Sequence, residues 1–178
     1  MTNLLSALND WTLSLDNGVG TDVIYLDFQK AFDTAPYCRL VKKLAIDAYG
    51  IKNSLLLWIK DFLDGRWQQV VLNGSASKAF MVSSGVPQGS VLGPLLFLLY
   101  VNDIPEQVKC NISMFADDTK IYTAIKNVAD SQRLQADLNS LANWANKWLL
   151  IFNVKKCKCM SIGPQLITTS YTIADEDN

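Results

Sequence analysis

The sequence has no histidine and few cysteines, and both shortages restrict its chemistry. Without histidine there can be no Ser-His or Cys-His nucleophile pair and no zinc site with an imidazole ligand. The four cysteines, Cys38, Cys110, Cys157 and Cys159, form no Cys-x-x-Cys pair and are expected to be free thiols, partly in the core. Any catalysis must therefore come from carboxylates, lysines, hydroxyls or a bound metal ion.

An excess of basic residues is also missing. Lys and Arg number 16 against 17 Asp and Glu, which gives a net charge of −1. A domain that grips nucleic acid by itself carries a clear surplus of positive charge, because Lys and Arg make most phosphate contacts. If this chain binds nucleic acid, we expect most of the phosphate contacts to come from parts that are not in this sequence.

No apolar run is long enough to cross a membrane. The longest, from Val91 to Val101, is interrupted by Gly93 and Pro94, whereas a spanning helix needs about 20 apolar residues. We expect a buried helix there instead. The N-terminus has neither the basic start nor the cleavage pattern of a signal peptide, so an intracellular protein without membrane contact is expected.

The 178 residues, 49% of them apolar, suit one domain or at most two, with a hydrophobic core. Periodicity and turn signals predict helices at 3–15, 40–48, 54–63 and 94–102, and a long one capped by Asp130 or Ser131. The first should bury Leu4, Leu8, Trp11 and Leu15, and the long one Leu134, Leu138, Leu141, Ala145 and Trp148. Expected strands are 23–26, 68–72 with 77–82, 112–115 with 119–122, and one within 151–162. Hairpins of this kind favour an α+β domain whose antiparallel sheet carries helices on one face.

Two acidic sites stand at strand ends. Asp27 ends a buried strand, and Asp117-Asp118 occupies the tip of a hairpin. Carboxylates that converge there repel one another unless a cation lies between them, and such hard oxygen ligands suit Mg²⁺. The alternative is an ordinary polar turn and a strand-end cap, since Asp is a favoured turn residue.

The segment Ser84–Ser90, Ser-Gly-Val-Pro-Gln-Gly-Ser, forms a second distinctive site. Its glycines allow close approach of the backbone to a ligand, and the amide of Gln88 could hold the edge of a base or sugar. An ordinary turn, with Ser90 as a helix cap, is the alternative.

Four segments together resemble the reverse transcriptases of non-LTR retrotransposons of the jockey and CR1 kind. The segment 23–34, with Asp27, resembles their first carboxylate motif, and 84–94 resembles their template-and-primer loop. Phe115–Asp118 is similar to their second carboxylate motif. Phe152-Asn153 with 155–158 is similar to the lysine motif that follows. The four occur in the family's order, and the resemblance covers roughly residues 3–163.

The resemblance implies a polymerase palm and a set of roles. Asp27, Asp117 and Asp118, with the carbonyl of Phe28, would hold two Mg²⁺ ions, for which Mn²⁺ could substitute. Phe32 would exclude the ribose 2′-hydroxyl, and Gln88 and Gly89 would contact the incoming nucleotide and the template. Lys156 or Lys158 would lie near the leaving pyrophosphate. The implied reaction transfers a nucleotide from a dNTP to the 3′-hydroxyl of a DNA primer on an RNA template.

The resemblance also implies that much of a polymerase is missing. We expect residues 1–163 to form a palm core without most of the fingers and thumb, and residues 164–178 to form a poorly ordered tail. Apolar faces left bare could then cause self-association, unless another chain supplies the missing parts. Two hypotheses follow: an RNA-directed DNA polymerase, or an inactive or co-opted remnant that binds a partner. Tyr37, where the family usually has His, departs from the pattern.

Overall fold

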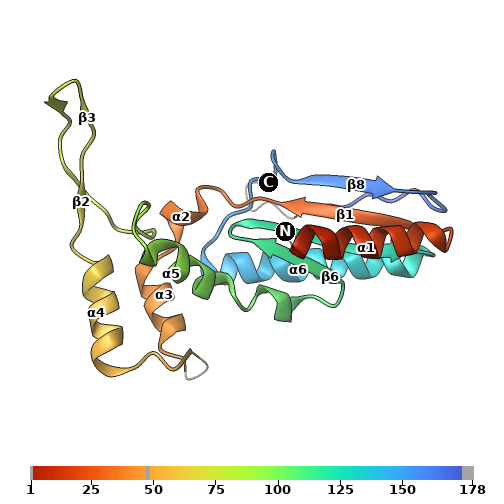
Figure 1. Cartoon of the computed structure of the whole chain (residues 1–178), viewed down its shortest axis with the longest axis horizontal. Helices are drawn as coiled ribbons and strands as arrows, with labels where there is room; N and C mark the ends of the chain where they lie inside the picture. The colour runs from red at the N-terminus through yellow and green to blue at the C-terminus, as the bar shows by residue number, and fades with distance from the viewer. Residues whose placement is uncertain (1, 47–48, 174–178) are drawn as a thin grey trace. The chain divides into compact units, whose positions relative to one another are not determined.

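A computed structural model describes residues 2–46 and 49–173 of the protein (Figure 1). The chain forms two compact units. The first joins Met1–Gln29 to Asp103–Asn178, and the second is Lys30–Asn102. Among the residues described, no helix is both long and apolar enough to span a membrane.

The first unit is built on a four-stranded antiparallel sheet with strand order β6-β7-β1-β8. The strands are β1 (Gly20–Leu26), β6 (Asn111–Phe115), β7 (Asp118–Ile125) and β8 (Lys158–Ile162). β1 pairs on both sides, and all of its residues except Tyr25 are buried. The strand predicted at 23–26 is confirmed as a central strand that starts three residues earlier.

Helix α1 (Thr2–Asp16) covers part of one face of this sheet. Its Ala7 and Trp11 bury themselves against Val23 and Tyr122, and the rings of Trp11 and Tyr122 meet edge to face at 5.9 Å. Of the apolar face expected for this helix, Trp11 is buried as predicted. The other three residues are exposed, which corrects the expectation: Leu4, Leu8 and Leu15.

Helix α6 (Val128–Trp148) covers the opposite face. Alternate residues of a strand point to the same side, so Ile24 and Phe28 face away from α1. The ring centroid of Phe28 lies 6.4 Å from that of Trp144 in α6. The antiparallel α+β class is therefore confirmed, but helices lie on both faces rather than on one. The predicted apolar stripe of α6 is buried throughout: Leu134, Leu138, Leu141, Ala145 and Trp148.

The cap of α6 differs from the prediction. Asn127, not Asp130 or Ser131, is the N-cap, and its side chain accepts from the backbone N–H of Asp130. The carboxylate of Asp130 accepts in return from the N–H of Asn127 at 3.2 Å. This reciprocal arrangement is a capping box, in which the acidic residue belongs in the first turn and not at the cap itself.

Residues 164–173 form no helix or strand, yet side chains hold them to the first unit. The buried carboxylate of Asp22 in β1 accepts from the hydroxyls of Thr169 (2.7 Å) and Tyr171 (2.6 Å). Ser161 of β8 donates to the same carboxylate at 2.6 Å. The predicted poorly ordered tail stays a prediction, and residues 174–178 lie outside the described part of the chain.

The second unit contains four helices among its described residues and a projecting β-ribbon. The helices are α2 (Ala31–Thr34), α3 (Tyr37–Leu44), α4 (Asn53–Leu63) and α5 (Leu92–Val101). α4 and α5 match the predictions closely. The helix expected at 40–48 starts at Tyr37 and ends at Leu44, and residues 47–48 lie outside the described part of the chain.

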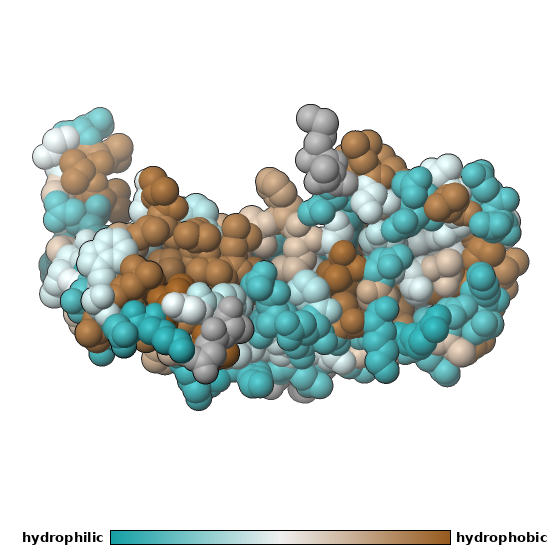
Figure 2. Space-filling view, turned by 60° about the horizontal axis from the view of Figure 1, so that its bottom comes forward, coloured by the Kyte–Doolittle hydropathy of each residue, from teal (hydrophilic) through white to brown (hydrophobic). Residues whose placement is uncertain are grey.

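The hairpin predicted around Asn73-Gly74 is confirmed, as a broken two-stranded ribbon extending from the helices of its unit (Figure 1). Both turn residues have positive φ (48° and 79°), which a type I′ turn requires. The paired segments are β2 (Trp67–Gln68) with β5 (Phe80–Met81), and β3 (Val71–Leu72) with β4 (Ser75–Ala76). All of these residues are exposed, and apolar side chains are visible along the ribbon in Figure 2.

Candidate active site

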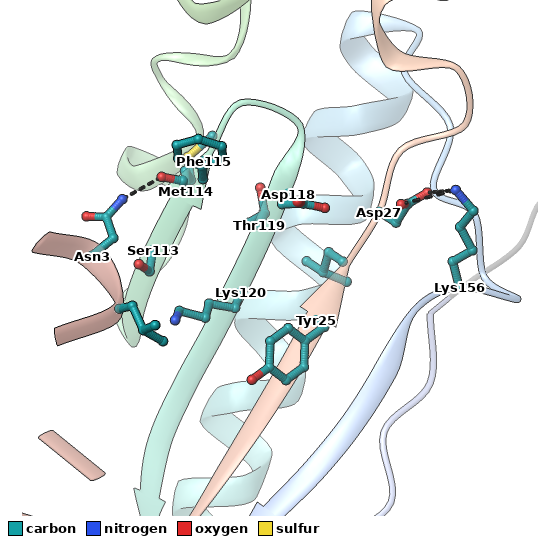
Figure 3. A pocket seen from close by; sticks show the side chains of 12 residues that line it. Asn3, Tyr25, Asp27, Ser113, Met114, Phe115, Asp118, Thr119, Lys120 and Lys156 are labelled. Carbon is teal, nitrogen blue, oxygen red and sulfur yellow. Dashed lines mark hydrogen bonds and ion pairs between the residues drawn. The ribbon is translucent and has the colours of Figure 1, made fainter. Parts of the chain in front are cut away.

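Two predicted carboxylates meet where β1 ends and β7 begins. The last pair of the β1–β7 ladder is Leu26 with Thr119, so the next step places Asp27 opposite Asp118. Opposed residues of antiparallel strands project to the same face. Figure 3 shows both carboxyl groups side by side at these strand ends. The sequence prediction that these motifs converge is thus realised for Asp27 and Asp118.

Asp117 lies in the tight turn between β6 and β7. Phe115 pairs with Asp118, so Ala116 and Asp117 form a two-residue hairpin loop. Ala116 has a φ of 55°, a conformation that hairpin turns usually give to glycine. A non-glycine residue held there costs of order 1–3 kcal/mol, and such strain is found preferentially at functional sites.

The environment of Asp27 lacks one partner. Its Oδ1 is buried and accepts no hydrogen bond from the part of the chain described. The Nζ of Lys156 lies 3.4 Å from each oxygen of the carboxylate, and the Asp27 side chain is 24% exposed. A buried carboxylate oxygen without a hydrogen bond is costly unless positive charge compensates it, so this position favours a cation.

A turn after α6 carries Lys156 to this carboxylate. The backbone N–H of Asn153 donates to the carbonyl of Asp27 at 2.8 Å, and the N–H of Lys156 donates to the carbonyl of Asn153 at 2.8 Å. Between the two lysines that the sequence left as candidates, Lys156 is the one that contacts a carboxylate. Lys158 begins β8 and pairs with Tyr25.

The ring of Phe28 anchors the same junction. It is buried and stacks on Phe152 with centroids 4.5 Å apart. The isolated bridge between these residues is framed by hydrogen bonds from Gln29 to Ile151 and from Asn153 to Asp27. Neither bond uses the carbonyl of Phe28, which is the group that the resemblance implies as a metal ligand.

A cavity of about 410 Å³ opens beside Asp27 and Asp118, within the first unit. Figure 3 shows Tyr25 and Lys120 on its wall, two residues along each strand from the carboxylates. The Nζ of Lys120 lies 5.2 Å from the ring of Trp11. Sequence reasoning missed Tyr25 and Lys120, although alternation along a strand places them on the face of Asp27 and Asp118.

The remaining predicted residues belong to the second unit. The N–H of Val86 donates to the carbonyl of Phe32 at 2.7 Å, and the ring of Phe32 stacks on Phe97 at 4.5 Å. Gln88 donates from Nε2 to Oδ1 of Asp33 at 3.1 Å. Asp33 therefore holds the loop amide, and the structure joins Phe32 and the loop 84–88 within one unit.

The carboxylates at the strand ends are donors that suit a divalent cation. Among residues 2–46 and 49–173, no three His, Cys, Asp or Glu side chains form a cluster that could hold a metal ion. Asp27 and Asp118 supply hard oxygen donors, which suit Mg²⁺, and the buried Oδ1 of Asp27 has no hydrogen-bond donor within this part of the chain. The two opposed carboxylates fit a cation site that is completed by substrate or water.

Residues 11–173 match the protein family described as "Reverse transcriptase (RNA-dependent DNA polymerase)". The chain belongs to this reverse transcriptase family. Its relatives include the RNA-directed DNA polymerase from mobile element jockey of Drosophila melanogaster, 33% identical over 142 residues. The jockey polymerase of Drosophila funebris is 32% identical over 142 residues. Each alignment covers 75% of this chain but 15% of the relative, so the chain spans a small part of those proteins.

Solved telomerases share the fold of this reverse transcriptase chain. Apo telomerase from Candida Tropicalis, truncated from its C-terminal domain, superimposes with a TM-score of 0.67 over 93% of this chain and 35% of that chain. Telomerase from Candida albicans, in complex with a TWJ fragment of telomeric RNA, gives 0.60 over 95% and 32%. The sequence identities are 15% and 12%. The palm-type α+β fold and the resemblance to jockey-like non-LTR reverse transcriptases are therefore confirmed.

Proposed function

We propose that this chain is the catalytic core of an RNA-directed DNA polymerase, which extends a DNA primer on an RNA template by nucleotidyl transfer from dNTPs. The observation that carries the proposal is the opposition of Asp27 and Asp118 at the ends of β1 and β7. Membership of the reverse transcriptase family supports it, and a telomerase of the same fold is bound to RNA.

The carboxylates would hold divalent ions. We propose Asp27 and Asp118, which already oppose each other, and the carbonyl of Phe28 as ligands. Asp117, in the adjoining turn, would join them when the ion binds. Mg²⁺ bound there would make the primer 3′-hydroxyl more nucleophilic and stabilise the leaving pyrophosphate. Asp27 and Asp118 already point to one face of the sheet, so little reorganisation is needed to bind a cation.

Lys156, beside the Asp27 carboxylate, would act on the leaving pyrophosphate. Its ammonium lies 3.4 Å from the carboxylate, and its side chain is 65% exposed, so it can swing to a phosphate when substrate binds. A lysine in that position stabilises negative charge and can give a proton to the leaving group. Lys158 belongs to the strand and is the weaker candidate of the two.

In the second unit, Phe32 is proposed to block ribonucleotides, and Gln88 with Gly89 to contact the incoming nucleotide and template. The stack on Phe97 and the hydrogen bond from Val86 fix the position of Phe32. A fixed position suits this role, because a Phe32 ring that moved aside would leave room for the ribose 2′-hydroxyl.

Primer extension tests the proposal. The chain would be given poly(rA)–oligo(dT), dTTP and Mg²⁺, beside Asp117→Ala and beside Asp61→Ala, an exposed aspartate of α4, as the control. Extension by the wild type and the control, with loss in Asp117→Ala, is the expected result. No extension by the wild type would contradict the proposal and favour a non-catalytic remnant.

A further inference from the structure

A second cavity, of about 690 Å³, lies wholly within the second unit at the root of the ribbon. We call it the ribbon-root groove. The ribbon base forms one wall through Arg66–Gln68, Met81 and Val82, and the loop 83–88 forms the other. Lys30 and Asp33 complete the lining. Its volume lies within the range of about 300–1,000 Å³ that is usual for ligand sites.

Hydrogen bonds hold the loop wall and orient the Gln88 amide. Ser84 donates through Oγ to the carbonyl of Asp33 at 2.8 Å, and the N–H of Gly85 donates to the carbonyl of Ala35 at 2.8 Å. Gln88 Nε2 donates to the Asp33 carboxylate, which can only accept. The amide orientation is therefore fixed, and its Oε1 is left to accept a hydrogen bond from a ligand.

Arg66 already donates hydrogen bonds to residues that hold this wall in place. Its Nε donates to the carbonyl of Leu63 at 3.0 Å, and one terminal nitrogen donates to the Tyr37 hydroxyl (2.6 Å) and the Gly85 carbonyl (3.2 Å). Lys30, in contrast, has an exposed side chain. Of the two cations that line the groove, Lys30 is the one suited to an incoming phosphate.

The ribbon wall carries an exposed aromatic face. Trp67 is 66% exposed and pairs with Met81, which is 62% exposed, so the two side chains share one face of the ribbon. Gln68 also lines the groove. Aromatic faces of this kind stack on bases of any sequence.

The charge of the region favours an anionic ligand. From Gly65 to Asn102 the sequence contains no Asp or Glu, although the whole chain has a net charge of −1. Arg66 and Lys78 are the charged residues of that segment. Asp33, the acid in the groove lining, is occupied by Gln88.

We propose that the ribbon-root groove binds an unpaired stretch of nucleic acid, with a base stacked on Trp67, a phosphate on Lys30, and a base edge on Gln88. This inference deepens the proposed polymerase function, because it names where the second unit holds a single strand. Binding of a strand in the groove requires neither a divalent ion nor nucleotidyl transfer. The groove assignment and the polymerase function can therefore fail separately.

The test is fluorescence anisotropy of labelled oligo(rU) and oligo(dT) of about ten nucleotides, titrated with the whole chain in EDTA. We expect Trp67→Leu to weaken binding about 5- to 150-fold, the range for loss of one stacked base, and Trp67→Phe to keep most of it. The matched control is Trp58→Leu, an exposed tryptophan of α4 that should leave affinity unchanged. Lys30→Met should lower the slope of log affinity against log salt by about 0.7, and Lys60→Met should not.

Equal affinity of Trp67→Leu and wild type would overturn the proposal, as would no binding of either oligonucleotide or binding of a duplex alone. Far-ultraviolet circular dichroism of each variant confirms that a loss is not unfolding, and Trp67 is exposed enough that its removal opens no core. Asp27→Asn should bind the oligonucleotides like wild type. Wild-type chain that binds the oligonucleotides but extends no primer would count against the polymerase function and leave the groove assignment standing.

Discussion

Asp27 and Asp118 oppose each other one residue beyond the last pair of the β1–β7 ladder, Leu26 with Thr119. Directly opposed residues have Cβ atoms about 4.5–5.5 Å apart, so two negative charges are concentrated at the strand ends. Lys156, 3.4 Å from the Asp27 carboxylate, supplies one compensating charge. We propose that this lysine occupies the place of a divalent cation until the ion binds.

Substitution of Lys156 by Met should separate metal binding from catalysis. Without the Lys156 ammonium, nothing competes with Mn²⁺ for the Asp27 carboxylate from that side, and no positive charge there repels the ion. Mn²⁺ affinity should therefore rise about two- to fivefold, the scale of an exposed ion pair. Primer extension should fall about tenfold or more, because the leaving group loses its charge partner. Mn²⁺ titration and extension rates on one preparation give both quantities.

The neighbouring Lys155→Met, also an exposed lysine of the same turn, is the control and should change neither quantity by more than about twofold. A Lys156→Met variant that bound Mn²⁺ more weakly would show that the lysine supports the site rather than competes for it.

Two glycines of the loop 84–90 should respond very differently to alanine. A Cβ on Gly85 would lie 2.6 Å from the Cα and carbonyl oxygen of Asp33 and from the carbonyl oxygen of Phe32. Gly89 has a similar φ of 84° but no atom within 4 Å of that position. We expect Gly85→Ala to cost more than about 3 kcal/mol of unfolding free energy and Gly89→Ala about 1 kcal/mol. Calorimetric unfolding measures both, and equal costs would mean that the loop does not pack against Asp33 as described.

The Asp22 network should make stability pH-dependent in alkali. Burial, with the hydrogen bond to Asp22 and its charge, raises the pKa of Tyr171 above its ordinary value of 10.0. The unfolded chain then loses the Tyr171 proton first, so its contribution is complete below about pH 10 and declines as the pH rises toward the raised folded value. Tyr171→Phe should flatten the fall of unfolding free energy above pH 10, as measured by urea titration at a series of pH values.

Thr169→Val removes another bond to the same carboxylate without removing a titrating group. It should lower stability at every pH and leave the slope unchanged. A slope in Tyr171→Phe as steep as that of the wild type would place the alkaline transition elsewhere.

Local sequence patterns predict the turns and hairpins described above. Asn73-Gly74 marked a turn by its residue types, and the β6–β7 hairpin was predicted with the acids at its tip. These signals lie within a few residues of one another, so no knowledge of distant packing is needed. The acids at the strand ends made their convergence one of two interpretations, and the resemblance to a known family favoured it over an ordinary polar turn, because spacing alone cannot show which strands pair.

Packing decided what the sequence could not. The buried face of α1 is the one that packs on Val23 and Tyr122, where Ala7 and Trp11 are buried while Leu4, Leu8 and Leu15 stay exposed. Asn and Asp are both favoured N-cap residues. The reciprocal hydrogen bonds between Asn127 and Asp130 make Asn127 the N-cap. Tyr25 and Lys120 were missed because their relevance depends on register with the carboxylates.

The most direct test of the central claim is Mn²⁺ binding by the whole chain, followed by electron paramagnetic resonance of the free ion. We predict that the wild type binds Mn²⁺ and that Asp27→Asn loses most of that affinity, because a carboxylate ligand becomes a neutral amide. Asp61→Asn, on α4, should bind like the wild type. Equal binding by Asp27→Asn and wild type would contradict the assignment of the β1–β7 strand ends as the metal site.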